Sequence, residues 1–262
     1  MQKSSDNINK FRKQQQKLKK MRTFLVLLIV IFIVFMLYLF KDSVFHPLKG
    51  IAGKIGNSET GSFPVQLPGS ASYGFDSADD VISLLTDTYL YTYSADGAYI
   101  ESFQHKYSNP KQKTYENRIM LYDKGGKTFS TYSKNKQIYE KTTDENIIFG
   151  TIGINNTVAV ITSSANYAGI LTIFTQDGLS FYTWKSYNSL MAATFNSDAS
   201  KAFTADITTE AGEFISKINC LSFTNSTGPE WTAEVKGAIP YGLYIIKQGL
   251  LAVYDDRAVI LN

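Results

Sequence analysis

Pairs of short strands separated by a polar turn recur along the chain at an interval of about 40 residues. Their turn residues, Asp96, Asn135, Asp177 and Asn225, are separated by 39, 42 and 48 positions. Asp-Gly at Asp96 and Asp177 favours tight hairpins, because such turns need positive φ, which glycine adopts without steric cost. The repeated hairpins read "YLYTYSADGAYIESF", "TFSTYSKNKQIYEK", "ILTIFTQDGLSFYTW" and "INCLSFTNSTGPEWTAEV".

Two further strands separate successive hairpins. They read "NIIFGTIG" and "TVAVITSS" in the third repeat, and "LMAATFNSD" and "KAFTADIT" in the fourth. A period of 40 to 45 residues with four strands is typical of β-propeller blades. We therefore predict an all-β, propeller-like domain over residues 63–262, with four-stranded blades of the WD40 or quinoprotein type.

The last repeat, "AIPYGLYIIKQGLLAVYDDRAVILN", supplies three strands, so the count is about four and a half blades. A strand from the N-terminal end could complete it, but the candidate "FPVQLPG" contains two prolines, which are poor ladder partners. We predict an open arc with residues 257–261 as an exposed edge strand that does not pair with residues 63–67. Such an edge invites pairing with other chains, which suggests that the sequence is incomplete at its C-terminus.

The first 22 residues form a basic tail that contains eight Lys or Arg and one acid. Residues 23–40, "TFLVLLIVIFIVFMLYLF", are uncharged and as a helix would reach roughly 27 Å, close to the thickness of a bilayer core. A cleaved signal peptide usually has a shorter apolar run, and "KDSVFHPLKG" lacks a small-x-small cleavage pattern. The basic residues nearest the span, which keep the tail inside by the positive-inside rule, are Lys17, Lys19, Lys20 and Arg22.

This pattern predicts a single-pass protein of the cell membrane with a cytoplasmic N-terminus. Residues 41–62, rich in glycine, are expected to be a linker, and residues 63–262 an extracytoplasmic domain. The tail is interpreted as a topology signal that contacts the lipid bilayer, and nucleic acid is not an expected partner. Cys220 is the single cysteine, which excludes an internal disulfide and favours a bacterial envelope. We expect Cys220 to face a core.

Motifs with catalytic or metal-binding chemistry are weak. "GGKT" at 125–128 copies the end of a phosphate-binding loop, but Leu121 stands where its first glycine belongs, so we predict a hairpin turn. "DSADD" at 76–80 matches no calcium-loop spacing. His46 lies in the linker, and His105 is expected to pack or hydrogen-bond between blades rather than act as a base. We therefore predict no catalytic residue, metal site or cofactor, and no enzyme activity.

Aromatic residues are abundant, and aromatic faces stack well on the apolar faces of sugars. Trp184, Trp231 and the seventeen tyrosines could form such a surface. Most of them fall on alternating strand positions, where packing between blades explains them equally well. The pattern leaves both readings open.

The run "QHKYSNPKQKTYENRIMLYDKGGKTFSTYSKNK", with the basic tail, the single span and "TDTYLYTYSADG", resembles a bacterial family of single-span membrane proteins. "YSNP" followed by "YDKGGKTF" is the most specific part of this resemblance. The family carries an uncharacterised extracytoplasmic propeller-like domain, a domain of unknown function. The resemblance implies a topology and a fold, and no catalytic residues.

Taken together, these features predict a membrane-anchored binding or scaffolding module of the bacterial envelope. Its expected partner is an envelope protein or a cell-wall glycan. A propeller presents loops on a rigid platform, which suits recognition. The alternatives are a glycan-binding protein and a quinone-cofactor propeller enzyme. The enzyme would need a coordinated cation and tryptophans stacked around the central channel, which two tryptophans and no clear ligand set do not favour.

Overall fold

The computed structural model describes residues 64–65, 72–224 and 228–261. The chain divides into two units, Met1–Glu59 and Thr60–Asn262, and every described residue belongs to the second. Among these residues, no helix has the length and apolar character that crossing a membrane requires. The predicted tail, span and linker, and the turn residue Asn225, lie outside the described residues.

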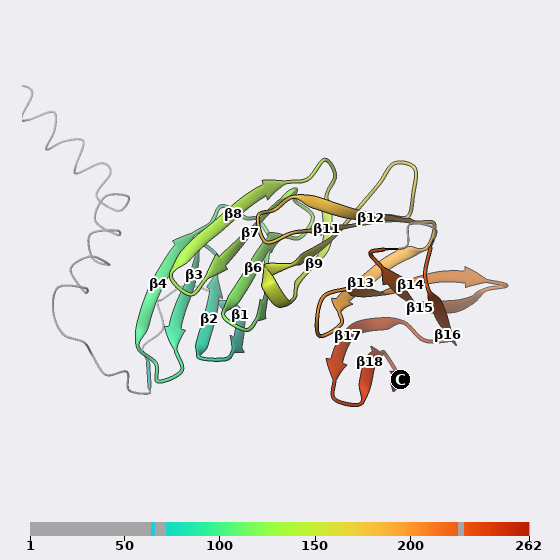
Figure 1. The fold of residues 1–262 in the computed structure, drawn as a ribbon. Helices are drawn as coiled ribbons and strands as arrows, with labels where there is room; N and C mark the ends of the chain where they lie inside the picture. The colour runs from blue at the N-terminus through green and yellow to red at the C-terminus, as the bar shows by residue number, and fades with distance from the viewer. Residues whose placement is uncertain (1–63, 66–71, 225–227, 262) are drawn as a thin grey trace, which may run out of the picture. The chain divides into compact units, whose positions relative to one another are not determined.

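Five antiparallel sheets make up the described part of the second unit, and they follow one another in chain order (Figure 1). The first sheet contains β1 (Ser72–Ala78), β2 (Val81–Thr86), β3 (Tyr89–Ser94) and β4 (Tyr99–Gln104). The second contains β5 (Pro110–Tyr115), β6 (Arg118–Asp123), β7 (Thr128–Ser133) and β8 (Lys136–Thr142). The third contains β9 (Ile147–Ile152), β10 (Val158–Thr162), β11 (Gly169–Phe174) and β12 (Ser180–Ser186), with the short helix η1 (Ile154–Asn156) between β9 and β10.

The fourth sheet contains β13 (Ser189–Phe195), β14 (Lys201–Glu210), β15 (Glu213–Ser222) and β16 (Trp231–Lys236). The fifth contains β17 (Pro240–Ile246), β18 (Gly249–Tyr254) and β19 (Ala258–Leu261). Each sheet is an up-and-down meander, so the strand order in space equals the order in sequence. The prediction of four complete four-stranded repeats and a three-stranded fifth is therefore confirmed.

The sheets pack face to face because their middle strands are apolar on both sides. In β6, Ile119 and Leu121 pack against the first sheet, whereas Met120 and Tyr122 pack against the third. Alternate side chains of a strand point to opposite faces, so one strand contributes to two cores. A sheet of this kind cannot bury both faces alone, which is why the repeats must stack.

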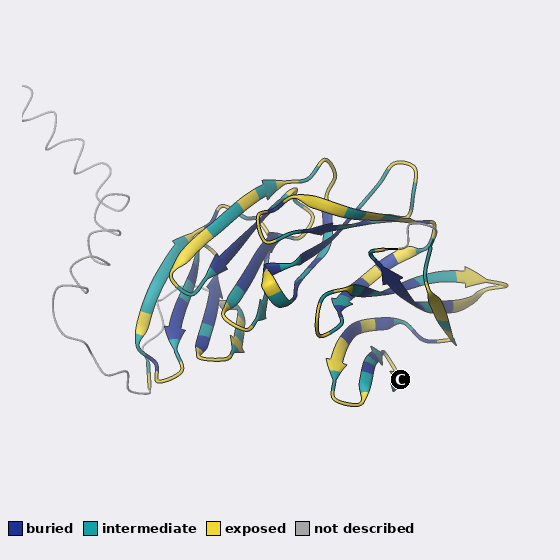
Figure 2. Ribbon diagram, in the orientation of Figure 1, coloured by how far each residue is buried: buried dark blue, intermediate teal, exposed yellow. Residues whose placement is uncertain are grey.

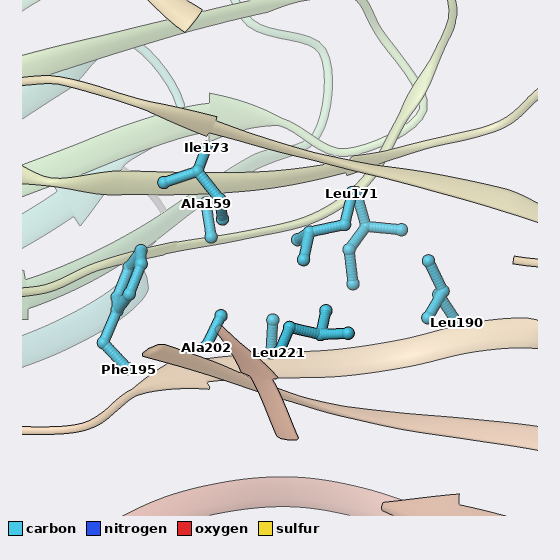
Figure 3. Packing of buried hydrophobic residues seen from close by; sticks show 9 residues of the cluster. Ala159, Leu171, Ile173, Leu190, Phe195, Ala202 and Leu221 are labelled. Carbon is cyan, nitrogen blue, oxygen red and sulfur yellow. The ribbon is translucent and has the colours of Figure 1, made fainter. Parts of the chain in front are cut away.

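Four apolar clusters fill the spaces between consecutive sheets. Figure 3 shows one of them, in which Leu171 and Ile173 of the third sheet face Ala202 and Leu221 of the fourth. Burying each leucine or isoleucine side chain of this cluster contributes about 1.5–3 kcal/mol. Figure 2 shows that burial is concentrated in the middle strands of the sheets and exposure in the turns and outer strands.

A carboxylate ties the first two strands together in two of the sheets. Asp123, at the end of β6, accepts the backbone N–H of Asn109 at 2.7 Å. Asp255, just after β18, accepts the backbone N–H of Ile239 at 2.9 Å. The "YDK" segment that ends β6 and the "YDD" segment that ends β18 are thus equivalent in structure.

The last strand, β19, pairs with β18 and has no second partner strand among the described residues. Of residues 63–67, only Pro64 and Val65 are described, and neither belongs to a strand. The predicted open arc, and the absence of pairing between residues 63–67 and 257–261, stay predictions.

Cys220 lies on β15 and is 1% exposed, so the prediction that it faces a core is confirmed. Burial raises the pKa of its thiol, and the thiol lies 3.8 Å from an Oε atom of Glu230.

We expect thiol reagents to label Cys220 in the folded full-length chain roughly a hundredfold more slowly than after urea denaturation, because reaction requires local opening. Stopped reactions analysed by mass spectrometry give both rates. A Thr183→Cys variant, exposed on β12, should label rapidly, and equally fast labelling of Cys220 would contradict this placement.

Candidate functional site

A cavity of about 440 Å³ lies where the first strands of all five sheets come together. Its lining includes residues of β1, β5, β9, β13 and β17, so no single repeat could form it. Each of these strands is the first of its sheet, and the first strands of consecutive sheets contact one another from β1 to β17. The volume falls within the roughly 300–1,000 Å³ of ordinary small-molecule sites.

A β-bulge shapes the cavity wall at β17. The pairing of β17 with β18 shifts between Pro240 and Gly242, so Tyr241 has no partner residue on β18. A bulge of this kind bends the strand and re-aims a side chain. As a result Tyr241 and Tyr244 both line the cavity, although they stand three positions apart, and they are 71% and 52% exposed.

Two glycines let aromatic rings lie directly against the backbone of the wall. A Cβ atom added at Gly242 would come within 2.9 Å of the ring of Tyr244. One added at Gly153 would come within 2.7 Å of the ring of Phe195. Both distances are shorter than a van der Waals contact, so a side chain at either position would displace a ring that lines the cavity.

The charged groups of the lining are one carboxylate and one ammonium, and each has a neighbour. Asp76 on β1 accepts the backbone N–H of Thr114 on β5 at 3.1 Å and that of Ser77 at 3.0 Å. The Nζ atom of Lys113 lies 5.9 Å from the centroid of the Phe149 ring, a cation–π contact. The cavity is therefore close to electrically neutral and rich in aromatic groups.

Of the turn residues singled out in the sequence, the three that the structure describes do not line this cavity. Asp96 and Asp177 stand in the turns β3–β4 and β11–β12, each followed by a glycine with positive φ. Asn135 stands in the turn β7–β8, where its Oδ1 atom accepts the hydroxyl of Ser133 at 3.4 Å. Asn225 and the topology residues Lys17, Lys19, Lys20 and Arg22 are outside the described residues.

The remaining sequence motifs have structural neighbours. "GGKT" forms the turn β6–β7, as predicted, with Gly125 at φ +89°. In "DSADD", Asp80 forms an ion pair with Lys134 of the second sheet at 3.2 Å. Within the described part of the chain, no group of three His, Cys, Asp or Glu side chains could hold a metal ion.

His105 is buried at the end of the first sheet. Its Nε2 atom lies 3.1 Å from the carbonyl oxygen of Thr86, and its Nδ1 atom accepts the backbone N–H of Tyr107 at 3.4 Å. These contacts fit the neutral ring protonated on Nε2, and burial lowers the pKa of His105. His105 therefore hydrogen-bonds as expected, but with Thr86 of its own sheet and Tyr107 directly after it rather than between blades.

The two tryptophans lie on outer strands rather than around the cavity. Trp184 is on β12, where it packs against the core between the third and fourth sheets. Trp231 is on β16, and its ring centroid lies 5.9 Å from that of Phe203. The sequence analysis did not single out Tyr241 and Tyr244 among the tyrosines. The segment "PYGLYI" does carry a signal for them, because a glycine and two tyrosines three positions apart interrupt the alternation expected of a strand.

A second, shallower hollow of about 310 Å³ lies beside the turn between β12 and β13. Its lining includes Tyr187, which is 81% exposed, and Phe214 of β15. Asn188 also lines it and donates to the buried carboxylate of Asp206 at 3.1 Å. The lining of this hollow comes from the fourth sheet and the turn that precedes it.

A family model described as "Family of unknown function (DUF5711)" matches residues 67–262. No curated protein matches the chain. Several solved propeller-type structures do, at low sequence identity. Hsv2 of Kluyveromyces lactis with loop 6CD replaced by a Gly-Ser linker aligns with a TM-score of 0.54 and 13% identity, over 74% of this chain and 66% of that one.

The N-terminal part of BBS1, in complex with ARL6, aligns with a TM-score of 0.54 and 11% identity, over 74% of this chain and 66% of that one. The WD40 β-propeller domain of Doa1 aligns with a TM-score of 0.52 and 9% identity, over 70% of this chain and 60% of that one. The chain thus spans less than two thirds of the length of each structure. At such identities the likeness concerns the fold, which is propeller-like.

Proposed function

The chain belongs to the family of unknown function DUF5711, and from the geometry of its cavity we propose that it is a binding module. The observation that carries the proposal is the convergence of five first strands on one cavity with exposed tyrosines. A concave site with aromatic walls and a few polar groups is the usual form of a binding site. Of the five sheets that hold it, the second, third and fourth are packed on both faces, which makes them a rigid support.

We further propose that the module is held at the outer face of a bacterial cell membrane. The support is in the sequence: an uncharged run at 23–40, basic residues before it and a glycine-rich linker after it. On this reading the bilayer is the first partner, and the second is an envelope protein or a cell-wall glycan that enters the cavity. Anchoring raises the local concentration of the module near such a partner.

A quinone-cofactor enzyme is the weaker alternative. That chemistry calls for tryptophans stacked around the central channel, and both tryptophans of this chain lie on the outer strands β12 and β16. The carboxylate of the cavity, Asp76, already accepts two backbone N–H groups. These placements favour a binding role without cofactor or catalysis.

Photocrosslinking of the full-length chain in intact cells tests the binding role. A photoreactive phenylalanine derivative at Thr194, in the cavity wall, should capture a discrete partner. The same substitution at Thr183, exposed on β12 and remote from the lining, is the matched control and should not. Equal capture at Thr194 and Thr183 would refute the proposal. So would the absence of capture both at Thr194 and at Thr151, a second position in the cavity wall.

The same cells test the anchor. Protease added outside should remove an epitope placed after residue 62 and spare one placed before residue 22, because the basic tail stays inside. The opposite pattern would reverse the proposed topology. The binding role does not depend on that result, because the crosslinking experiment tests it separately.

A further inference from the structure

We infer that the central cavity binds an uncharged oligosaccharide, with Tyr241 and Tyr244 as its stacking platform. The inference rests on the proposed binding role and adds the chemical class of the ligand. Three properties of the lining carry it: the exposure of its aromatic rings, its free hydroxyl groups, and its lack of net charge.

The aromatic rings come first. Tyr241 and Tyr244 are large apolar surfaces left in contact with solvent, which is costly unless something covers them. Tyr115 and Phe149 add half-buried rings from two other sheets to the same wall, which also includes the buried ring of Phe195 from a third. A pyranose ring carries C–H groups on its faces, so it can lie flat on a tyrosine or phenylalanine ring and remove both surfaces from water.

The hydroxyl groups of the wall can hydrogen-bond with the hydroxyl groups of a sugar. Thr151 on β9 and Thr194 on β13 line the cavity, and neither hydroxyl has a hydrogen-bond partner among the described residues. A hydroxyl both donates and accepts, as each sugar hydroxyl does. The lining therefore offers hydrogen bonds beside its aromatic rings without requiring a charge on the ligand.

The charges of the lining argue against an ionic ligand. Asp76 accepts two backbone N–H groups, and Lys113 lies over the ring of Phe149, so each charge has a neighbour in the wall. A phosphate or a carboxylate would lose water in the cavity and meet a single ammonium, offset by the carboxylate of Asp76 in the same lining. Burying an unpaired charge costs far more than burying a hydroxyl that finds a hydrogen bond. An uncharged ligand is the class that this lining accommodates.

Calorimetric titration of the full-length chain in detergent micelles tests the inference. The probes are three uncharged tetrasaccharides: cellotetraose, maltotetraose and tetra-N-acetylchitotetraose. We expect at least one to bind with a 1:1 stoichiometry. Fully deacetylated chitotetraose, which has the same backbone with positive charges at pH 6, should bind at least tenfold more weakly than its acetylated form if that form is the ligand.

Variants assign the binding to the tyrosines. Tyr241→Ala and Tyr244→Ala should each weaken binding about tenfold, because they remove a stacking face. Tyr244→Phe should bind like the unmodified chain, since it keeps the ring. Tyr187→Ala, which removes an equally exposed tyrosine at the second hollow, should have no effect and thereby controls for general loss of aromatic surface.

The outcomes separate this inference from the proposed function. If no uncharged tetrasaccharide binds, or if binding ignores both cavity tyrosines, the inference is wrong. Capture of a protein partner at Thr194 would then leave the binding role standing with a different ligand. If neither a sugar binds nor a partner is captured, the inference and the proposed function fail together.

Discussion

Replacing Phe129 by alanine is expected to lower the free energy of unfolding by about 3–5 kcal/mol. Phe129 is fully buried on β7, in the core between the second and third sheets. Its ring centroid lies 5.2 Å from that of Phe174 and 6.0 Å from that of Tyr139. Truncation removes these contacts and leaves a cavity that rigid sheets cannot close.

Chemical denaturation of the full-length chain, followed by circular dichroism, measures this loss. For a domain of this size the melting temperature should fall by about 10 °C. Phe75→Ala is the matched control: Phe75 is a phenylalanine on a strand but 68% exposed, and its loss should change stability by less than about 0.5 kcal/mol. Equal losses in the two variants would mean that the second and third sheets do not share this core.

Removing the buried carboxylate at Asp206 is expected to cost about 1–3 kcal/mol. Asp206 is 2% exposed on β14 and accepts amide hydrogen bonds from Asn188 at 3.1 Å and from Asn219 at 2.9 Å. Alanine would leave the amide of Asn219, which is itself buried, with a single acceptor, the hydroxyl of Thr204 at 3.3 Å. Asp206→Asn keeps an acceptor oxygen and should lose less.

The charge of Asp206 should also be visible in the pH dependence of stability. Burial raises the pKa of Asp206 above its usual 3.8, although the two amides and Lys217 oppose the shift. The folded state therefore holds the proton more tightly than the unfolded state. Stability should fall as pH rises from 3.8 through the raised pKa, because the folded carboxylate must then ionise.

Comparison of the unmodified chain with Asp206→Asn isolates this contribution. The difference in unfolding free energy between the two proteins, measured from pH 3.5 to 8, should shift in favour of the asparagine variant as pH rises. A difference that stays constant with pH would show that Asp206 does not titrate as its surroundings suggest.

The strands and turns of this fold could be predicted because they depend on neighbours in the sequence. The Asp-Gly turns at Asp96 and Asp177 need a positive φ that the next residue supplies. Consecutive apolar residues predict that β6 is buried on both faces, because neighbouring residues of a strand, such as Ile119 and Met120, point to opposite faces. The 40-residue interval then implies stacked sheets, because no sheet could cover both faces alone.

The cavity was beyond this reasoning because its walls come from strands up to about 170 positions apart. Asp76 and Tyr244 line one space, and nothing local relates them. The bulge at Tyr241 depends on how β17 pairs with β18, which sequence alternation does not specify. For the same reason the sequence could not place Trp184 and Trp231, which it offered as part of a sugar-binding surface and which lie on outer strands.

By itself, then, the sequence determined which segments are strands, where the chain turns, and that the repeats must stack. These properties follow from local backbone preferences and from the burial of each strand's two faces. The tertiary structure alone decided which side chains meet at the centre, because that depends on the angle and register at which the sheets pack. Gly242 is an example. In the sequence it indicates only an interruption of a strand, whereas in the structure its missing side chain leaves the space that the ring of Tyr244 occupies.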